Sequence, residues 1–127
     1  MNQGVISLGS NIEPEANIAM AVEMIAAGHR IVAQSKLVRT RPIGRTDQPD
    51  FLNGAVRIET AMDREELERW LKSAEEQLGR APGGDKWGPR TIDLDLAVWN
   101  GRVVHDDVRQ RDFLRTAVLE IWPDLTI

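Results

Sequence analysis

The sequence has 127 residues and no cysteine. This absence excludes disulfide bonds, thiolate metal sites and cysteine nucleophiles. No apolar stretch approaches 18 residues, so a transmembrane helix is not expected. The first residues, Met-Asn-Gln-Gly, lack the charged start and the long apolar run of a signal peptide. We therefore expect a cytoplasmic protein that does not bind membranes.

Basic residues are also fewer than acidic ones: the sequence has 16 Lys and Arg against 20 Asp and Glu, which gives a net charge of −4. Proteins that wrap nucleic acid need clustered Lys and Arg, so we expect no nucleic-acid partner. The length predicts one domain, residues 1–127, which is large enough to bury a core of its own. We expect this domain to be a monomer or a weak dimer.

Several familiar motifs are missing. The sequence contains neither the P-loop pattern G-x-x-x-x-G-K-[ST] nor the dinucleotide pattern G-x-G-x-x-G, so a nucleotide site here would be of another type. Neither His29 nor His105 has a serine or carboxylate partner that spacing identifies, so no nucleophilic triad is predicted. His105 and the two aspartates after it are more typical of an exposed turn than of a metal site.

The apolar pattern predicts an α+β fold. It indicates alternating strands and amphipathic helices in the order β-α-β-β-α-β, which is the ferredoxin-like split βαβ pattern. This topology gives an antiparallel sheet with two helices on one face. The predicted strands cover residues 5–8, 31–38, 55–58 and 92–99, and the predicted helices cover residues 14–28 and 63–79.

Connections and the C-terminal end are also predicted. Turn-forming residues place loops at residues 39–50 and 80–90. Asp63 and Glu66 fit a capping box at the start of the second helix. Asn100-Gly101 predicts a hairpin turn, and residues 113–121 predict a short closing helix.

Two carboxylates in the last long strand are the sharpest chemical feature. Alternation sends Ile92, Leu94 and Leu96 to the helix-covered face and places Asp93 and Asp95 on the other face. The Cα atoms of the two aspartates would lie roughly 6.5–7 Å apart. Asp is disfavoured in strands, and one reason for two of them is to hold Mg²⁺. A solvated sheet face with ordinary acidic residues explains the pair equally well.

Two flanking segments bear on this choice. Residues 80–91 include three cations and an indole immediately before the acidic strand, a set that suits phosphate beside a metal. In the other segment, the loop from Thr40 to Asn53, Phe51 offers a flat face and Asn53 a paired donor and acceptor for a heterocycle edge. A rigid connection, with Phe51 in the core and Asn53 capping a turn, is the alternative.

Four blocks in order resemble one enzyme family. They are Gly-Ser-Asn at 9–11, Asp-Gln-Pro-Asp-Phe-Leu-Asn at 47–53, Leu-Gly-Arg at 78–80 and Trp-Gly-Pro-Arg-Thr-Ile-Asp-Leu-Asp at 87–95. Together they closely resemble the 6-hydroxymethyl-7,8-dihydropterin pyrophosphokinases of folate biosynthesis. The resemblance covers about residues 4–105. It implies a ferredoxin-like fold, ATP as co-substrate and transfer of pyrophosphate to the pterin hydroxymethyl group, leaving AMP.

The resemblance also implies a role for individual residues. Asp93 and Asp95 would bind two Mg²⁺ ions and, with Arg80 and Arg90, form the catalytic set. The residues expected to contact the pterin or close over the substrates are Thr40, Pro42, Ile43, Phe51, Asn53, Trp87 and Phe113. Those expected on the ATP side are Glu75, Lys86, Arg90 and Arg111.

The sequence also departs from the family pattern. Residues 81–84 read Ala-Pro-Gly-Gly and supply none of the extra basic residues that usually follow the glycine-arginine pair. The segment after the hairpin is short, and a Pro-His element that contacts ATP is not evident. An active, compact pyrophosphokinase is the main hypothesis. A pyrophosphokinase for a variant pterin, and a pterin- or nucleotide-binding paralogue with little turnover, remain open.

Overall fold

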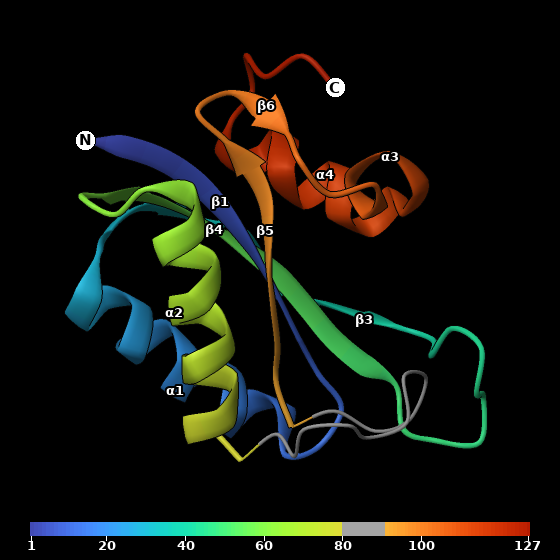
Figure 1. Cartoon of the computed structure of the whole chain (residues 1–127). Helices are drawn as coiled ribbons and strands as arrows, with labels where there is room; N and C mark the ends of the chain where they lie inside the picture. Colours follow the sequence, from blue (N-terminus) through green and yellow to red (C-terminus); the bar gives the residue numbers. More distant parts are fainter. Residues whose placement is uncertain (80–90) are drawn as a thin grey trace.

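The computed structural model describes residues 1–79 and 91–127, and a single antiparallel sheet organises them (Figure 1). Six strands of the described residues form this sheet in the order β2-β4-β1-β5-β6, with β3 pairing with β4. Their bounds are β1 (Asn2–Ser10), β2 (Arg30–Gln34), β3 (Val38–Thr40), β4 (Phe51–Thr60), β5 (Asp93–Trp99) and β6 (Arg102–Val103).

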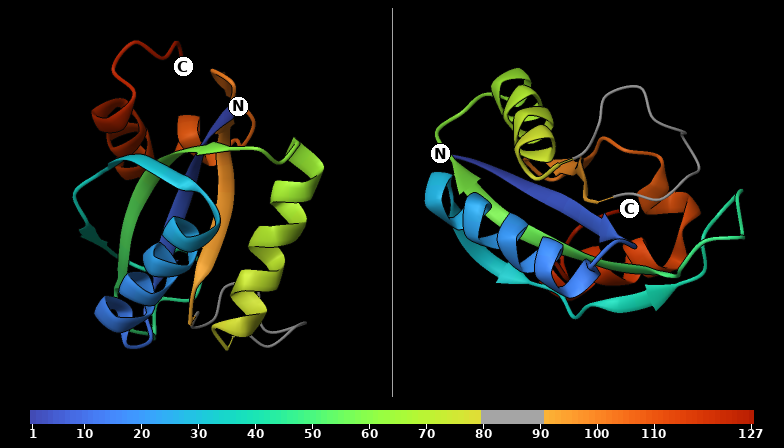
Figure 2. Two further views of the ribbon diagram at one scale, coloured as in Figure 1. Left: turned by 90° about the vertical axis from the view of Figure 1, so that its left-hand side faces the viewer. Right: turned by 90° about the horizontal axis from the view of Figure 1, so that it is seen from below.

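Helices lie on both faces of the sheet (Figure 2). Their bounds are α1 (Pro14–Gly28), α2 (Arg64–Gln77), α3 (Asp107–Gln110) and α4 (Asp112–Ile121). The order β1-α1-β2-β4-α2-β5, with β4 and β1 central, confirms the predicted ferredoxin-like α+β fold. As expected, α1 and α2 share one face; α3 and α4 are the C-terminal addition on the other.

The first core cluster fills the space between the sheet and the helices α1 and α2. Ile92, Leu94 and Leu96 are buried in it, as the alternation along the strand predicts. The helices contribute Ile18, Ala21 and Ile25 from α1 and Leu67, Leu71 and Ala74 from α2. The predicted capping box is present, because Asp63 accepts from the Glu66 N–H and Glu66 accepts from the Asp63 N–H.

The second core cluster lies on the opposite face. Val5 and Ala97 of the sheet pack there against Leu114, Val118 and other apolar residues of α4. The helices α3 and α4 cover only part of this face of the sheet. The polar residues of β5 beside them therefore remain accessible from one side. This partial cover leaves a pocket beside the two helices.

The predicted boundary between a strand over residues 31–38 and a loop starting at residue 39 is wrong. The chain leaves the sheet at residues 35–37 and pairs with β4 again through β3. Ser35 Oγ accepts the Ala55 N–H at 2.9 Å and so replaces a ladder bond. Leu37 lies so close over Gly54 that a Cβ there would be 2.5 Å from Leu37 Cδ2. Because both contacts are tertiary, the local pattern does not reveal the break.

None of the helices in residues 1–79 and 91–127 has the length and apolar character needed to cross a bilayer.

Burial of His29 makes the stability of this fold depend on pH. The imidazole lies at the end of α1, 2.9 Å from Thr60 Oγ1 and edge-on to Trp70, with ring centroids 4.5 Å apart. Its Nε2 is buried without a hydrogen-bond partner among the described residues. Burial lowers the pKa of His29 below its ordinary value of 6.5.

We predict that the free energy of unfolding falls as the pH drops from about 7 to 5. Below about 6.5 the unfolded chain binds a proton at His29 that the folded chain does not, and the loss levels off below the folded pKa. Urea unfolding at a series of pH values measures this slope, which should be smaller in His29→Asn. His105→Asn is the control; equal slopes for wild type and His29→Asn would contradict the prediction.

Candidate functional site

A pocket opens on the sheet face that carries α3 and α4. It lies where β1, β4 and β5 meet, beside the segment that follows β3. Its volume is about 180 Å³, less than the roughly 300–1,000 Å³ that is usual for ligand pockets. Its lining consists of Ser7, Leu8, Gly9, Thr40, Arg41, Ile43, Phe51, Asn53, Gly54, Asp93, Asp95, Asp107, Arg111, Phe113 and Leu114.

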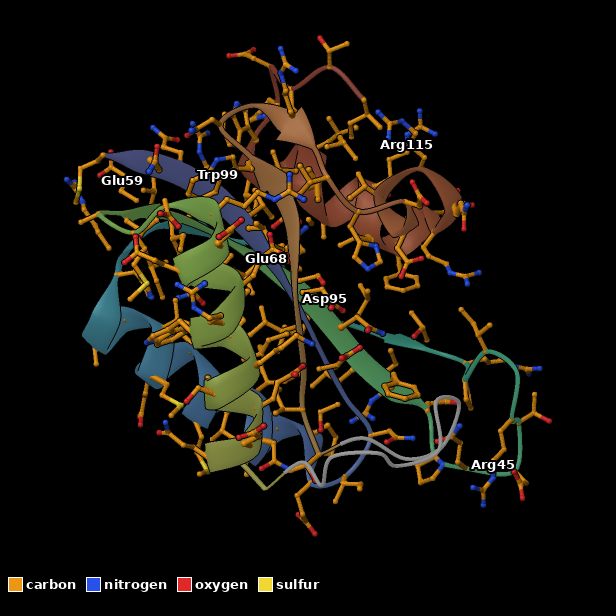
Figure 3. All side chains as sticks on the ribbon, viewed as in Figure 1. Arg45, Glu59, Glu68, Asp95, Trp99 and Arg115 are labelled. Carbon is orange, nitrogen blue, oxygen red and sulfur yellow. The ribbon has the colours of Figure 1, made fainter. Side chains whose placement is uncertain are left out.

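Asp93 and Asp95 form the acidic side of the pocket. They point to the same face of β5 while Leu94, between them, is buried in the first core cluster. Asp93 lies opposite Gly9 and Asp95 opposite Ser7 on the neighbouring strand β1. Figure 3 labels Asp95 on β5, next to the C-terminal helices. The expected pair of carboxylates on one face is therefore present and lines a cavity instead of an open solvated surface.

Asn53 and Phe51 form a second side of the pocket. Asn53 Nδ2 donates to Thr40 Oγ1 at 2.5 Å, so β3 and β4 hold the amide between them. Phe51 lines the pocket and belongs to neither core cluster formed by the described residues. Asn53 lies within β4, which rules out the turn-capping alternative. Phe113, at the start of α4, brings a second aromatic ring to the same cavity.

The end of β1 ties the surrounding segments together. Ser10 and Asn11 are 0% and 4% exposed. Ser10 Oγ donates to the carbonyl of Thr91 at 2.6 Å, immediately before β5. Asn11 Nδ2 donates to Gln48 Oε1 at 2.8 Å and to the carbonyl of Pro49 at 3.1 Å. The Gly-Ser-Asn block thus anchors both segments that border the pocket.

A third carboxylate in the pocket was not predicted as a site residue. Asp107, at the start of α3, lines the cavity, and one of its oxygens lies 4.0 Å from Arg111 Nε. The Asp107 N–H donates to His105 Nδ1 at 3.1 Å, so His105 orients the start of α3. Arg41 also lines the pocket, and its position between Thr40 and Pro42 was the available signal.

The structure brings together most of the predicted site residues that it describes. Thr40, Ile43, Phe51, Asn53, Asp93, Asp95, Arg111 and Phe113 all line the one pocket. Pro42 is buried next to it, and Glu75 lies on α2, on the other side of the sheet, in contact with β5. Four predicted residues, Arg80, Lys86, Trp87 and Arg90, lie outside the described residues.

The fold and the pocket define a class: α+β proteins of ferredoxin-like topology whose cavity joins strand carboxylates to aromatic rings and an amide. The model of the 7,8-dihydro-6-hydroxymethylpterin-pyrophosphokinase (HPPK) family matches residues 5–123, and the chain belongs to this family.

Curated relatives agree with this assignment. A 2-amino-4-hydroxy-6-hydroxymethyldihydropteridine pyrophosphokinase of Methylorubrum extorquens is 42% identical, over 100% of this chain and 87% of that protein. The protein of the same name from Haemophilus influenzae is 30% identical, over 96% of this chain and 82% of its own. A folate synthesis bifunctional protein of Arabidopsis thaliana is 32% identical over 92% of this chain and 26% of its own length.

The contact between Gly9 and Asn53 gives a test of the pocket geometry. A Cβ at position 9 would lie 2.9 Å from Asn53 Oδ1, the end of a side chain that can rotate away. We predict that Gly9→Ala displaces the Asn53 amide and breaks its bond to Thr40, at a cost in stability below about 1 kcal/mol. The side-chain amide resonances of Asn53 would shift in NMR spectra.

Gly4→Ala on the same strand is the matched control. There a Cβ would lie 3.3 Å from the backbone oxygen of Val98, which cannot rotate away. We expect this variant to lose about 1 kcal/mol of stability and to leave the Asn53 resonances in place. An Asn53 amide unmoved in Gly9→Ala would contradict the described register around the pocket.

Proposed function

We propose that this chain is an active pyrophosphokinase that acts in folate biosynthesis. The pterin hydroxymethyl oxygen attacks the β-phosphorus of ATP, and the bond from that phosphorus to the α–β bridging oxygen breaks. AMP leaves with the bridging oxygen, and the hydroxyl proton passes to solvent. The observation that carries the proposal is the pairing of Asp93 and Asp95 with Phe51, Asn53 and Phe113 in one cavity, in a chain of this family.

The carboxylates fit Mg²⁺. Proteins usually bind this ion through one or two carboxylates, with substrate phosphates and water completing an octahedron. Asp93 and Asp95 supply that number of protein ligands from one rigid strand. The remaining ligands of such a site would come from substrate phosphates and water. Bound there, Mg²⁺ ions, two by the resemblance, would neutralise phosphate charge and acidify the acceptor hydroxyl.

The opposite side of the cavity suits the pterin. Phe51 and Phe113 are the residues that we propose stack on its two faces, from β4 and α4. The Asn53 amide provides a donor and an acceptor for the edge of the heterocycle, and Thr40 holds that amide in place. Ile43 and the backbone around Pro42 would close the rim. Stacking and edge bonding would bring the hydroxymethyl group beside the acidic strand.

Positively charged side chains would bind the phosphates of ATP. Arg111 lines the described pocket and is the guanidinium that we propose faces the phosphates. By resemblance, Arg80, Lys86 and Arg90 join it, and Trp87 closes over the substrates. Glu75 belongs to the same side by resemblance. We propose that the chain acts in the cytoplasm as one domain spanning residues 1–127.

The central test removes the carboxylates one at a time. We predict that Asp93→Ala and Asp95→Ala each lower the rate of AMP release by at least about 100-fold, because metal-held phosphate charge is lost. A coupled assay with ATP, Mg²⁺ and 6-hydroxymethyl-7,8-dihydropterin measures this rate. Asp124→Ala, an exposed carboxylate near the C-terminal end, is the control.

The same assay decides between enzyme and binding protein. Wild-type turnover that depends on Mg²⁺ and disappears in both Asp variants supports the enzyme. No AMP above background from wild type, together with measurable pterin binding, would support the paralogue with little turnover.

Stacking by Phe51 gives an independent test of the pterin side. Loss of one aromatic stack on a flat heterocycle costs about 1–3 kcal/mol, so Phe51→Leu should raise the Kd for the pterin about fivefold or more. Phe51→Tyr retains the ring and should bind nearly as well as wild type. Fluorescence titration of the pterin measures both constants, and an unchanged Kd in Phe51→Leu would refute the stacking role.

A further inference from the structure

A buried carboxylate reaches the acidic strand from the opposite layer of the molecule. Glu75, on α2, is 8% exposed, although Glu is mostly exposed in folded proteins and is rarely buried without a partner. Its Oε2 accepts the backbone N–H of Leu94 at 2.7 Å. Leu94 is the residue between Asp93 and Asp95, so this bond fixes the backbone from which both carboxylates project.

The position of Leu94 in the sheet explains why an acceptor is needed. β1 covers one edge of β5, while β6 pairs only with Val98 and Trp99. In the described residues no strand therefore covers the outer edge of β5 at Leu94, and its N–H is buried against α2. An edge N–H without an acceptor would let this end of β5 shift or fray. The carboxylate provides a charge-assisted bond in its place.

We infer that Glu75 is a positioning residue for the metal-binding carboxylates. Its bond to Leu94 sets the backbone torsions on both sides of that residue, and with them the spacing and direction of Asp93 and Asp95. This inference rests on the proposed function, because it assigns Glu75 to the Mg²⁺ site through β5. The bond has the role of an outer-shell contact, made to the backbone of the ligand strand instead of to a ligand side chain.

The alternative is that Glu75 acts by its negative charge alone. Two substitutions separate the roles. Glu75→Gln keeps the length and an acceptor oxygen but removes the charge, whereas Glu75→Asp keeps the charge but withdraws the acceptor by one methylene. Positioning predicts that Gln is tolerated and Asp is not, and a charge role predicts the reverse. Glu76→Gln, at the exposed neighbouring position on α2, is the matched control.

Two measurements on the full chain test the inference. The first is hydrogen exchange of the Leu94 amide by NMR, which we expect to be slow in wild type and Glu75→Gln and fast in Glu75→Asp. The second is calorimetry with Mn²⁺ in the presence of α,β-methylene-ATP, an analogue that cannot be cleaved between its α- and β-phosphates. We expect Mn²⁺ binding to weaken about tenfold or more in Glu75→Asp and to stay close to wild type in Glu75→Gln.

The outcomes distinguish this inference from the proposed function. Mn²⁺ binding lost in Glu75→Gln and kept in Glu75→Asp, or unchanged in both, would overturn the positioning role while leaving the metal site intact. If Asp93→Ala and Asp95→Ala bind Mn²⁺ as tightly as wild type does, the proposed function itself is overturned. Circular dichroism and urea midpoints confirm that each variant is folded.

Discussion

The register of β1 between its two neighbours is the constraint on which the site depends. Gly9 lies opposite Asn53 on one side and opposite Asp93 on the other, so one residue of β1 sets the Asn53 amide beside the acidic strand. A slip of one residue would turn every side chain of a strand to the other face. Ile6 and Leu8, buried under α1 and α2, oppose such a slip because they would lose their core contacts.

The chain that follows β1 extends this control into the loops. Ser10 and Asn11 are buried. Their hydrogen bonds hold Thr91 on one side and the Gln48-Pro49 segment on the other. The same short block therefore fixes the entry to β5 and the rim of the pocket. A loop anchored at its base by hydrogen bonds keeps its pocket residues near one position, which lowers the entropic cost of binding.

Much of this arrangement can be predicted from sequence because it follows from short periods. Alternation along residues 92–96 correctly separates the core side chains from the two aspartates, and the capping box and the closing helix are local signals. The break between β2 and β3 is not local, since it needs Leu37 to pack over Gly54. α3 has four residues, too few for a periodic signal, so the arrival of Asp107 in the pocket was not predicted.

The charges of the pocket give the proposed metal a further role. Of the described residues that line the cavity, Asp93, Asp95 and Asp107 are acidic and only Arg41 and Arg111 are basic. Such a lining repels a triphosphate until a divalent cation reverses the local charge, because unscreened like charges at a few ångströms are costly. Under the proposed function, the metal would therefore add to the positive charge that Arg111 and, by the resemblance, Arg80, Lys86 and Arg90 offer the phosphates. The overall charge of −4 is compatible with such a phosphate-binding site, since local basic side chains and a bound metal, and not the net charge of the chain, would attract ATP.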